Sequence, residues 1–425
     1  MKSYAQMSRE ELSNELEALQ KDYQSYVDMH LSLNMARGKP SSEQLDLSRP
    51  MLDVINSGSD LIASDGTDAR NYGCLDGLPE AKKLMADMMD SKPDDMIIYG
   101  NSSLNIMFDQ ISRSYSFGVM GETPWCKLDQ KVKWLCPVPG YDRHFGITEF
   151  FGFEMIPVEM SEEGPDMDKV EELVKDPMVK GIWCVPKYSN PGGVVYSDEV
   201  VKRLAALNPA AKDFRIYWDN AYCVHHLYDE EVEVLDILKA CEAASHPDMV
   251  YKFGSTSKIS FPGAGIAAMA TSQANKEDIL SKMTHQTIGH DKINQLRHVR
   301  FFKDIDGIKE HMKKHADIIR PKFEAVNAIL EENLGGLEVG EWTHPKGGYF
   351  ISFTGLDHTA KRIVSLAKEA GVVMTGAGST YPYKKDPKDS NIRIAPTLPP
   401  LEEIQMAAKL FTICVKIASI EVLMK

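Results

Sequence analysis

Apolar positions between residues 50 and 300 occur as short runs that alternate with longer stretches of helical spacing. The short runs predict strands at residues 133–138, 153–158, 181–185, 214–218 and 250–253. Helical patterns such as residues 167–174 and 198–206 separate these runs. The alternation predicts an α/β fold with a mostly parallel sheet covered by helices. In such a fold, functional residues are expected just after the strands, at the carboxyl edge of the sheet.

The two ends of the chain have a different pattern. Residues 8–29 predict an amphipathic helix that begins with a capping box formed by Ser8 and Glu11. A long helical pattern from Asp304 to about Asn333 has the length of an interdomain connector. The smaller α+β unit that follows has expected strands and helices near residues 349–353, 359–370, 372–375, 392–394 and 401–423.

Three segments follow from these patterns. Residues 1–48 are expected to form an N-terminal helix followed by an irregular segment. Residues 49–303 form a large domain that carries the strand-end motifs. Residues 304–425 form the connector helix and the C-terminal small domain.

Composition and charge exclude several classes of protein. The chain has 425 residues, of which 43% are hydrophobic and 26% charged, as expected for a globular protein of two or three domains. A net charge of -14 argues against nucleic-acid binding. The polar N-terminus and the absence of an apolar run of about 20 residues argue against a secretory signal and a membrane span. Seven cysteines without C-x-x-C spacing indicate reduced thiols in a cytoplasmic protein, and they indicate no metal site.

Four short motifs follow the predicted strands or precede a helix. Three of them come in order: Ser189-Asn190-Pro191-Gly192-Gly193, Asp219-Asn220-Ala221-Tyr222 and Ser255-Thr256-Ser257-Lys258. Each is a common sequence by itself, but their order and shared placement at strand ends argue against chance agreement. The fourth, Gly100-Asn101-Ser102-Ser103, precedes a helical pattern, where free N–H groups and the helix dipole attract an anion.

These motifs resemble those of the fold-type I, class I/II aminotransferases, which depend on pyridoxal 5'-phosphate (PLP). The resemblance extends from Asn34 to Arg393, and residues 139–145 and 256–265 resemble an aspartate aminotransferase subgroup. It implies a large PLP-binding domain with a mostly parallel seven-stranded sheet, a smaller α+β domain, and a homodimer with shared active sites. The implied reaction is amino transfer from aspartate to 2-oxoglutarate by a ping-pong mechanism through a Schiff base on Lys258.

The resemblance assigns chemical roles to residues at the strand ends. A Schiff base requires a reactive amine, and Lys258 matches the lysine that supplies it. Asp219 would keep the pyridine nitrogen protonated, and His144 would orient this carboxylate. Tyr222 and Asn190 would hydrogen-bond the phenolic oxygen of the ring.

The cofactor's ring face and phosphate need further contacts. Those that the resemblance implies are Tyr141 on the ring, and Ser102, Ser103, Ser255, Ser257 and the neighbouring subunit's Tyr72 near the phosphate. One departure stands out, because many relatives have an arginine eight residues after the lysine, where this chain has Ile266. The sequence does not identify the cation that replaces it.

A substrate carboxylate is best held by a planar guanidinium. Arg393 matches the family's carboxylate arginine, with Gly38 of the N-terminal strap and Asn190 beside it. A dicarboxylic substrate needs a second cation, for which Arg143 is the first candidate because it lies close to the expected ring plane. Arg37 is the second, and Arg297 and Arg300 follow. An exposed salt bridge is the alternative role for Arg143.

Two other functions stay open from the sequence. Other PLP chemistry on the same scaffold, such as a kynurenine or aromatic aminotransferase or a carbon–sulfur β-lyase, shares most of the motifs. A PLP-sensing regulator would carry a DNA-binding domain, but only about 30 residues precede the aminotransferase-like region, and they contain no helix-turn-helix.

Overall fold

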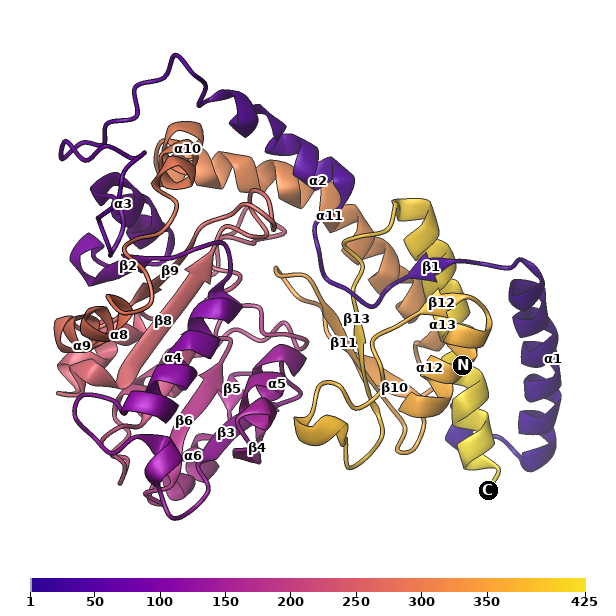
Figure 1. The fold of residues 1–425 in the computed structure, drawn as a ribbon. Helices are drawn as coiled ribbons and strands as arrows, with labels where there is room; N and C mark the ends of the chain where they lie inside the picture. Colours follow the sequence, from indigo (N-terminus) through magenta and orange to yellow (C-terminus); the bar gives the residue numbers. More distant parts are fainter. Residues whose placement is uncertain (1) are drawn as a thin grey trace.

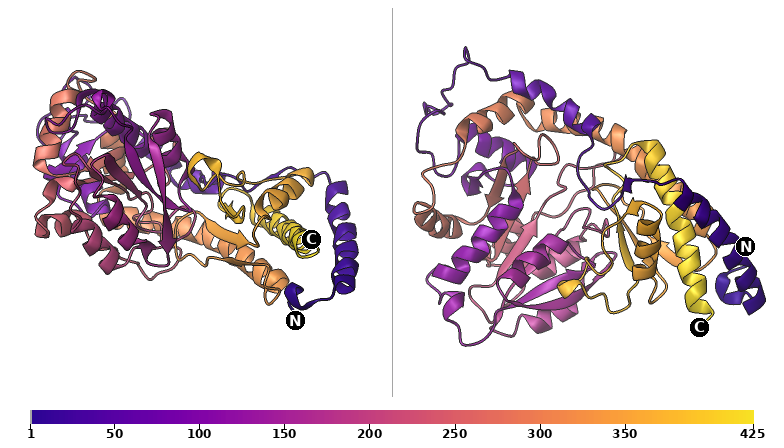
Figure 2. Two further views of the ribbon diagram at one scale, coloured as in Figure 1. Left: turned by 90° about the horizontal axis from the view of Figure 1, so that it is seen from below. Right: turned by 45° about the vertical axis from the view of Figure 1, so that its right-hand side comes forward.

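The computed structural model describes residues 2–425, whose helices and strands form two layered parts joined by one long helix (Figure 1). The larger part is built on an eight-stranded sheet, and the smaller part contains a three-stranded and a two-stranded sheet. The first and last long helices both lie on the smaller part (Figure 2). No helix within residues 2–425 combines the length and apolarity needed to cross a bilayer.

The large sheet has the strand order β2-β9-β8-β7-β6-β3-β4-β5. Its strands are β2 Met96–Ile98, β3 Lys133–Val138, β4 Glu154–Ser161, β5 Gly164–Pro165, β6 Val179–Cys184, β7 Arg215–Asp219, β8 Val250–Ser255 and β9 Ala267–Ala270. The five strands from β8 to β4 are parallel. β9 and the two-residue β5 are antiparallel to their neighbours. The expected α/β class is confirmed, and β5 adds a short edge to the seven longer strands.

Helices cover both faces of this sheet, which explains why its central strands are continuous apolar runs. β3, β6 and β7 are almost entirely buried. The covering helices and their neighbours are α3 Pro79–Met88, α4 Ser103–Phe117, α5 Asp142–Phe150, α6 Met167–Leu173, α7 Asp198–Ala205, α8 Ile237–Ala243, α9 Gln273–Met283 and α10 Lys292–Phe302. Inside the sheet core, Trp183 contacts Trp134 and Tyr217 with ring centroids 5.2 and 5.0 Å away.

The smaller part combines both ends of the chain. Its antiparallel sheet consists of β10 Gly340–Trp342, β11 Ile351–Gly355 and β13 Asn391–Ile394. The strap that follows α1 contributes β1 Leu33–Asn34, which pairs with β12 Val372–Val373. The remaining helices are α1 Arg9–Asp28, α2 Ser42–Leu47, α12 Ala360–Glu369 and α13 Leu401–Leu423. Helix α1 packs on α13 and begins with the expected Ser8–Glu11 capping box.

The expected connector is helix α11, Ile305–Leu334. Its N-cap Asp304 accepts a hydrogen bond from the Gly307 amide at 2.9 Å. The helix packs on α2, α3 and α10 near its start and on α13 of the smaller part. It therefore fixes the smaller part against the carboxyl edge of the large sheet.

A tight packing point in the sheet provides a test of this core. An added Cβ at Gly181 in β6 would lie 2.5 Å from the Trp134 ring and 2.9 Å from the Arg215 carbonyl oxygen. We expect Gly181→Ala to destabilise the protein by about 1–3 kcal/mol, because neither the buried ring nor the backbone can move freely. Gly146→Ala in helix α5, where a Cβ meets no atom within 4 Å, is the matched control. The thermal unfolding midpoints of both variants test this prediction. Equal midpoints for the two variants would contradict the close packing of Gly181 on Trp134.

Candidate active site

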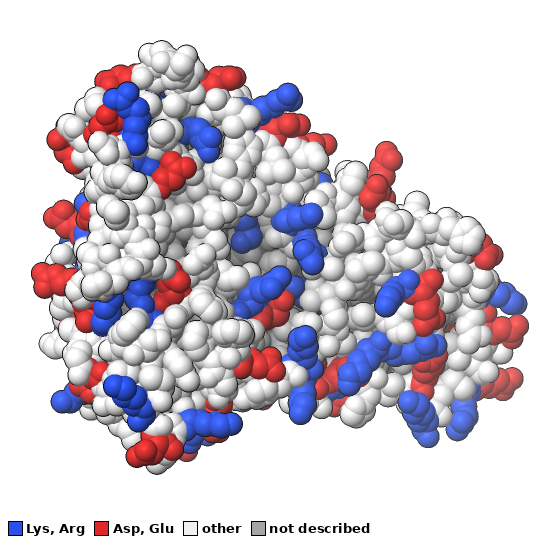
Figure 3. All heavy atoms as spheres, in the orientation of Figure 1, with Lys and Arg blue, Asp and Glu red and all other residues white. Residues whose placement is uncertain are grey.

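A cavity of about 580 Å³ lies at the carboxyl edge of the large sheet, between the two parts of the molecule. Figure 3 shows it as a hollow with lysine and arginine side chains at its rim. Its walls come from the segments after β6, β7 and β8, the starts of α4 and α5, the strap at residues 36–39, and strand β13. This is the position expected for functional residues of a mostly parallel sheet.

The structure brings nearly all of the sequence-predicted site residues into this cavity. Those that line it are Gly38, Ser102, Ser103, Tyr141, Arg143, Asn190, Asp219, Tyr222, Ser255, Ser257, Lys258 and Arg393, together with Arg37. Tyr72 does not line it and is 81% exposed. Arg297 and Arg300 of the same chain also lie outside it.

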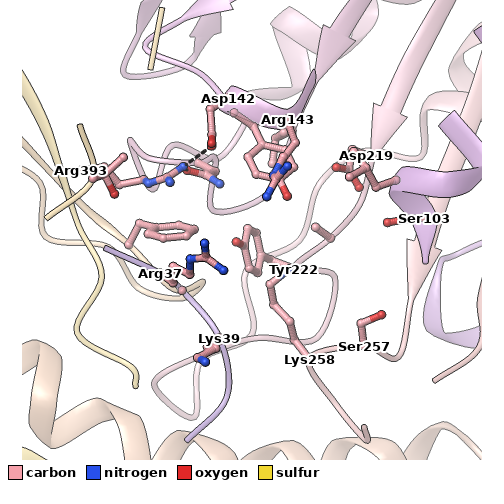
Figure 4. A pocket seen from close by; sticks show the side chains of 18 of the residues that line it. Arg37, Lys39, Ser103, Asp142, Arg143, Asp219, Tyr222, Ser257, Lys258 and Arg393 are labelled. Atoms are coloured by element: carbon pink, nitrogen blue, oxygen red, sulfur yellow. Dashed lines mark hydrogen bonds and ion pairs between the residues drawn. The ribbon is translucent and has the colours of Figure 1, made fainter. Parts of the chain in front are cut away.

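Lys258 follows strand β8, and its side chain enters the cavity beside Tyr222 (Figure 4). The Nζ atom lies 5.0 Å from the Tyr222 ring centroid. The Lys258 carbonyl oxygen accepts a hydrogen bond from the Tyr349 hydroxyl at 3.4 Å, and Gln44 donates to the same hydroxyl at 2.9 Å. Burial lowers the pKa of the Lys258 amine below its ordinary value, although the Asp219 charge opposes this shift. The amine is therefore available as a nucleophile or base nearer to neutral pH.

Asp219 ends strand β7 and is 3% exposed. Its Oδ2 atom lies 3.0 Å from Nε2 of His144, which donates the hydrogen bond if the acid is ionised. His144 in turn stacks on Trp183, with ring centroids 4.4 Å apart and planes 11° apart. The Oδ1 atom of Asp219 is buried and has no hydrogen-bond partner within residues 2–425. Since buried polar atoms are normally paired, Asp219 is placed to accept a donor from a bound group.

Two tyrosines lie near this carboxylate. Tyr222 is 2% exposed, and burial raises the pKa of its hydroxyl well above the ordinary value. Burial, with a contribution from Asp219, raises the pKa of Tyr141 to about 12. Both hydroxyls therefore stay protonated at neutral pH and are available as hydrogen-bond donors.

Ser103 and Ser257 lie on the side of Lys258 that faces away from Arg37 and Arg393 (Figure 4). The Ser255 and Ser257 hydroxyls are 2.6 Å apart, and both donate to the Asn101 carbonyl oxygen, at 3.2 and 2.6 Å. Ser102 is the N-cap of α4, so the first turn of this helix begins at the cavity. Hydroxyls and a helix N-terminus together suit an anion.

Ile266 occupies the position where many members of the family have an arginine that pairs with the phosphate. It is 1% exposed, and its backbone N–H and carbonyl groups are hydrogen-bonded to Thr256. Its side chain belongs to the hydrophobic core and does not reach the cavity. The donors that this chain offers to an anion at the serine end are therefore hydroxyl groups and the backbone N–H groups at the start of α4.

Arg393 on β13 defines the other end of the cavity. Its Nη1 atom donates to Asp142 Oδ1 at 2.7 Å and to Asn190 Oδ1 at 3.2 Å. Its guanidinium carbon lies 4.8 Å from the Phe350 ring centroid. An added Cβ at Gly38 would lie 2.4 Å from that ring, so only glycine lets the strap close over it. The strap thus fixes the ring on which the guanidinium rests.

Arg143 projects from the first turn of α5 into the cavity (Figure 4). It belongs to none of the ion pairs formed within residues 2–425, so the alternative of an exposed salt bridge loses its support. The lining residues that were not singled out from the sequence include Lys39, Asp142 and Phe350. Asp142 could have been found, because it stands inside the quoted phrase at residues 139–145.

The cavity combines a half-buried lysine, a buried acid with one free oxygen, and a guanidinium. These groups suit an enzyme whose substrates carry amino and carboxylate groups. Residues 7–425 match the family model for aspartate amino-transferase, and the chain belongs to this family. The protein is an aminotransferase that acts on amino acids and oxo acids.

Similar proteins agree with this assignment. The aspartate aminotransferase of Corynebacterium glutamicum is 49% identical over 406 residues, which cover 95% of this chain and 94% of that protein. The crystal structure of an aspartate transaminase from Corynebacterium glutamicum has a TM-score of 0.97 at 47% identity, with 99% of both chains covered. The fold is shared with LysN, the alpha-aminoadipate aminotransferase of Thermus thermophilus complexed with N-(5'-phosphopyridoxyl)-L-leucine. That match has a TM-score of 0.73 and 19% identity and covers 91% of this chain and 92% of the other.

The lowered pKa of Lys258 can be tested chemically. In protein freed of bound aldehydes, we expect Lys258 to be acetylated with a pH midpoint below that of the exposed lysines in the same sample. The reason is that burial favours the neutral amine, so deprotonation occurs at lower pH. Mass spectrometry of peptides after brief labelling at a series of pH values measures each midpoint. A midpoint for Lys258 equal to or above that of the exposed lysines would show that burial does not lower the pKa of its amine.

Proposed function

We propose that this aminotransferase uses PLP, held by Lys258, to transfer an amino group from aspartate to 2-oxoglutarate by a ping-pong mechanism. The observation that carries the proposal is the buried, unpartnered Oδ1 atom of Asp219 in the same cavity as the Lys258 amine. A carboxylate in this state requires a cationic or N–H donor from a bound group.

The residues of the cavity fit PLP at three points. Asp219 Oδ1 matches a protonated pyridine nitrogen, because both would otherwise be unpaired. The hydroxyls of Ser255 and Ser257 and the start of α4 match a phosphate group. Lys258 offers an amine to an aldehyde. The phosphopyridoxyl ligand of LysN, a protein with the same fold, supports the same choice of cofactor.

When bound, PLP supplies an electron sink for the negative charge that develops at the substrate's α-carbon. Asp219 would hold the protonated ring nitrogen, and His144, which stacks on Trp183, keeps the Asp219 carboxylate in one orientation. Tyr222 would donate a hydrogen bond to the phenolic oxygen of the ring, from a hydroxyl that burial keeps protonated. The Nζ atom of Lys258 would accept the proton of the substrate's α-carbon and deliver it to the cofactor carbon that carries the amino nitrogen, so that the amino group stays with the cofactor and the substrate leaves as an oxo acid.

A ping-pong order is expected because both substrates would use the same groups. Arg393 would bind the α-carboxylate of the amino donor and of the oxo acid, and Lys258 would serve as the base for both. Amino donor and oxo-acid acceptor would therefore use the same groups in turn. The first product must leave before the second substrate binds.

The cations of the cavity support a dicarboxylic substrate. Arg393 would bind the α-carboxylate, with Asn190 and Gly38 beside it, and Arg143 would bind the distal carboxylate. Arg37 and Lys39 add positive charge along the strap side of the same space (Figure 4). An aromatic side chain would have to displace water from these charged groups without replacing their partners, which disfavours the kynurenine and aromatic alternatives. The relative from Corynebacterium glutamicum, named aspartate aminotransferase, supports the choice of aspartate.

We further propose a cytoplasmic homodimer with shared active sites. Tyr72, which is 81% exposed and outside its own cavity, would reach the phosphate of the neighbouring subunit. Within each chain, residues 1–48 and 304–425 would form the small domain, and residues 49–303 the large PLP-binding domain. The pairing of β1 with β12 and the packing of α1 on α13 support this division.

An amino-donor screen tests the proposed reaction. We expect PLP-loaded protein to form glutamate from 2-oxoglutarate most rapidly with aspartate as donor. Lys258→Ala should lower kcat by about 1,000-fold or more, because it removes both the cofactor's attachment and the base. Activity with a different donor but not aspartate would contradict the substrate, and normal turnover by Lys258→Ala would contradict the mechanism.

The role of Arg143 has its own test. We expect Arg143→Ala to raise the KM for aspartate by about 10- to 100-fold, the loss expected for a charge-assisted hydrogen bond. The KM for alanine, which lacks the distal carboxylate, should change little. Arg9→Ala, on the exposed surface of α1, is the matched control. An equal rise in the KM for aspartate and for alanine would show that Arg143 does not bind the distal carboxylate.

A further inference from the structure

The guanidinium of Arg393 already holds a carboxylate that belongs to the protein. Asp142, the first residue of α5, places Oδ1 2.7 Å from Nη1 of Arg393 (Figure 4). The two residues are 251 positions apart in the sequence and come from α5 of the larger part and β13 of the smaller part. Asp142 is therefore not a local partner of Arg393, and its carboxylate lies in the space that a substrate carboxylate would use.

The Nη1 donors of Arg393 are already in use. Nη1 carries two N–H groups, and Asp142 and Asn190 supply an acceptor for each, at 2.7 and 3.2 Å. Both acceptors line the cavity, so a carboxylate that approaches from the cavity meets the Nη1 end of the guanidinium. There, a bidentate carboxylate would use the Nη1–Nη2 edge. It gains Nη1 only when one of the present acceptors leaves.

Asp142 is the acceptor better able to leave. The Asn190 side chain is buried, with the whole residue 5% exposed, whereas the Asp142 side chain is 34% exposed at the start of a helix. Two carboxylates on one guanidinium edge also repel each other, and a neutral amide does not. Asp142 can rotate into solvent, while Asn190 stays beside the bound substrate.

We propose that Asp142 is an internal competitor for the carboxylate site, which pairs with Arg393 until a substrate carboxylate displaces it. The proposal rests on the role of Arg393 in the proposed function. Displacement exchanges one carboxylate for another at Arg393, so this contact alone adds little net affinity. A ligand with a second carboxylate gains a further contact at Arg143. Asp142 thus keeps monocarboxylates and small anions too weakly bound to occupy the site.

The size of the effect follows from the fraction of molecules in which Arg393 is free. If Asp142 occupies Arg393 in about nine molecules of ten, the apparent dissociation constant of any carboxylate is weakened about tenfold. Removing the competitor should tighten monocarboxylates and dicarboxylates by the same factor, because the contact at Arg143 is unchanged. If Asp142 merely oriented Arg393, its removal would instead weaken the binding of carboxylates.

Calorimetric titration of the PLP-loaded protein with succinate and with propionate tests this proposal. We expect Asp142→Asn, which removes the charge and keeps the shape, to bind both ligands about tenfold more tightly than the unaltered protein. Asp142→Glu should restore competition and weaken binding again. Glu149→Gln is the matched control, because it removes one exposed charge from the same helix away from Arg393. Melting temperatures of all variants establish that each is folded.

The outcomes separate the inference from the proposed function. Succinate binding that Arg393→Ala abolishes upholds the carboxylate site. Unchanged or weaker binding by Asp142→Asn would then overturn only the competitor role and make Asp142 a support for Arg393. If neither the unaltered protein nor Asp142→Asn binds succinate, the carboxylate site itself fails, and the inference fails with it.

Discussion

The site depends on the hydrogen bond between the buried carboxylate of Asp219 and His144. This bond pairs one carboxylate oxygen and leaves the other without a partner within residues 2–425. Leaving a buried acceptor unpaired costs about 1–3 kcal/mol, and more when it is charged. The fold maintains it because β7 ends there, His144 holds Oδ2, and Trp183 supports the His144 ring. A ligand that supplies a donor to Oδ1 removes this cost, so the fold favours a bound group with an N–H or cationic donor at this point.

The other charged and polar groups of the cavity lie on either side of the Lys258 amine. Hydroxyls and a helix N-terminus, which would suit an anion, lie at one end, and Arg393 with its neighbours, proposed to bind a carboxylate, lies at the other end. Lys258 lies between them, where loss of hydration favours its neutral form. The two parts of the molecule supply different ends, so the connector helix α11 and the strap over Phe350 set the distance between the anion sites. The Asp142–Arg393 pair occupies one of these sites from within the chain.

Much of this arrangement could be predicted from the sequence, because strand and helix patterns are local. The runs that form β3, β6, β7 and β8 are long and apolar, and the motifs stand directly after the last three. Strands β2 and β9 were not predicted; β9 is mostly alanine, which has no strand preference, and β2 has three residues. The stacking of His144 on Trp183 and the pairing of Asp142 with Arg393 join distant positions, and no local pattern encodes such contacts. The expected contact of Tyr72 with the phosphate of a neighbouring subunit stays a prediction.

The claim that Asp219 Oδ1 would receive the cationic nitrogen of PLP can be tested by a titration of PLP into protein carrying Asp219→Asn. An amide at this position removes the charge with little change in shape. We expect PLP to bind about 10- to 100-fold more weakly than to the unaltered protein, the loss of one charge-assisted hydrogen bond. Asp357→Asn on the exposed surface should bind PLP normally. Unchanged PLP affinity in the Asp219 variant would contradict the claim.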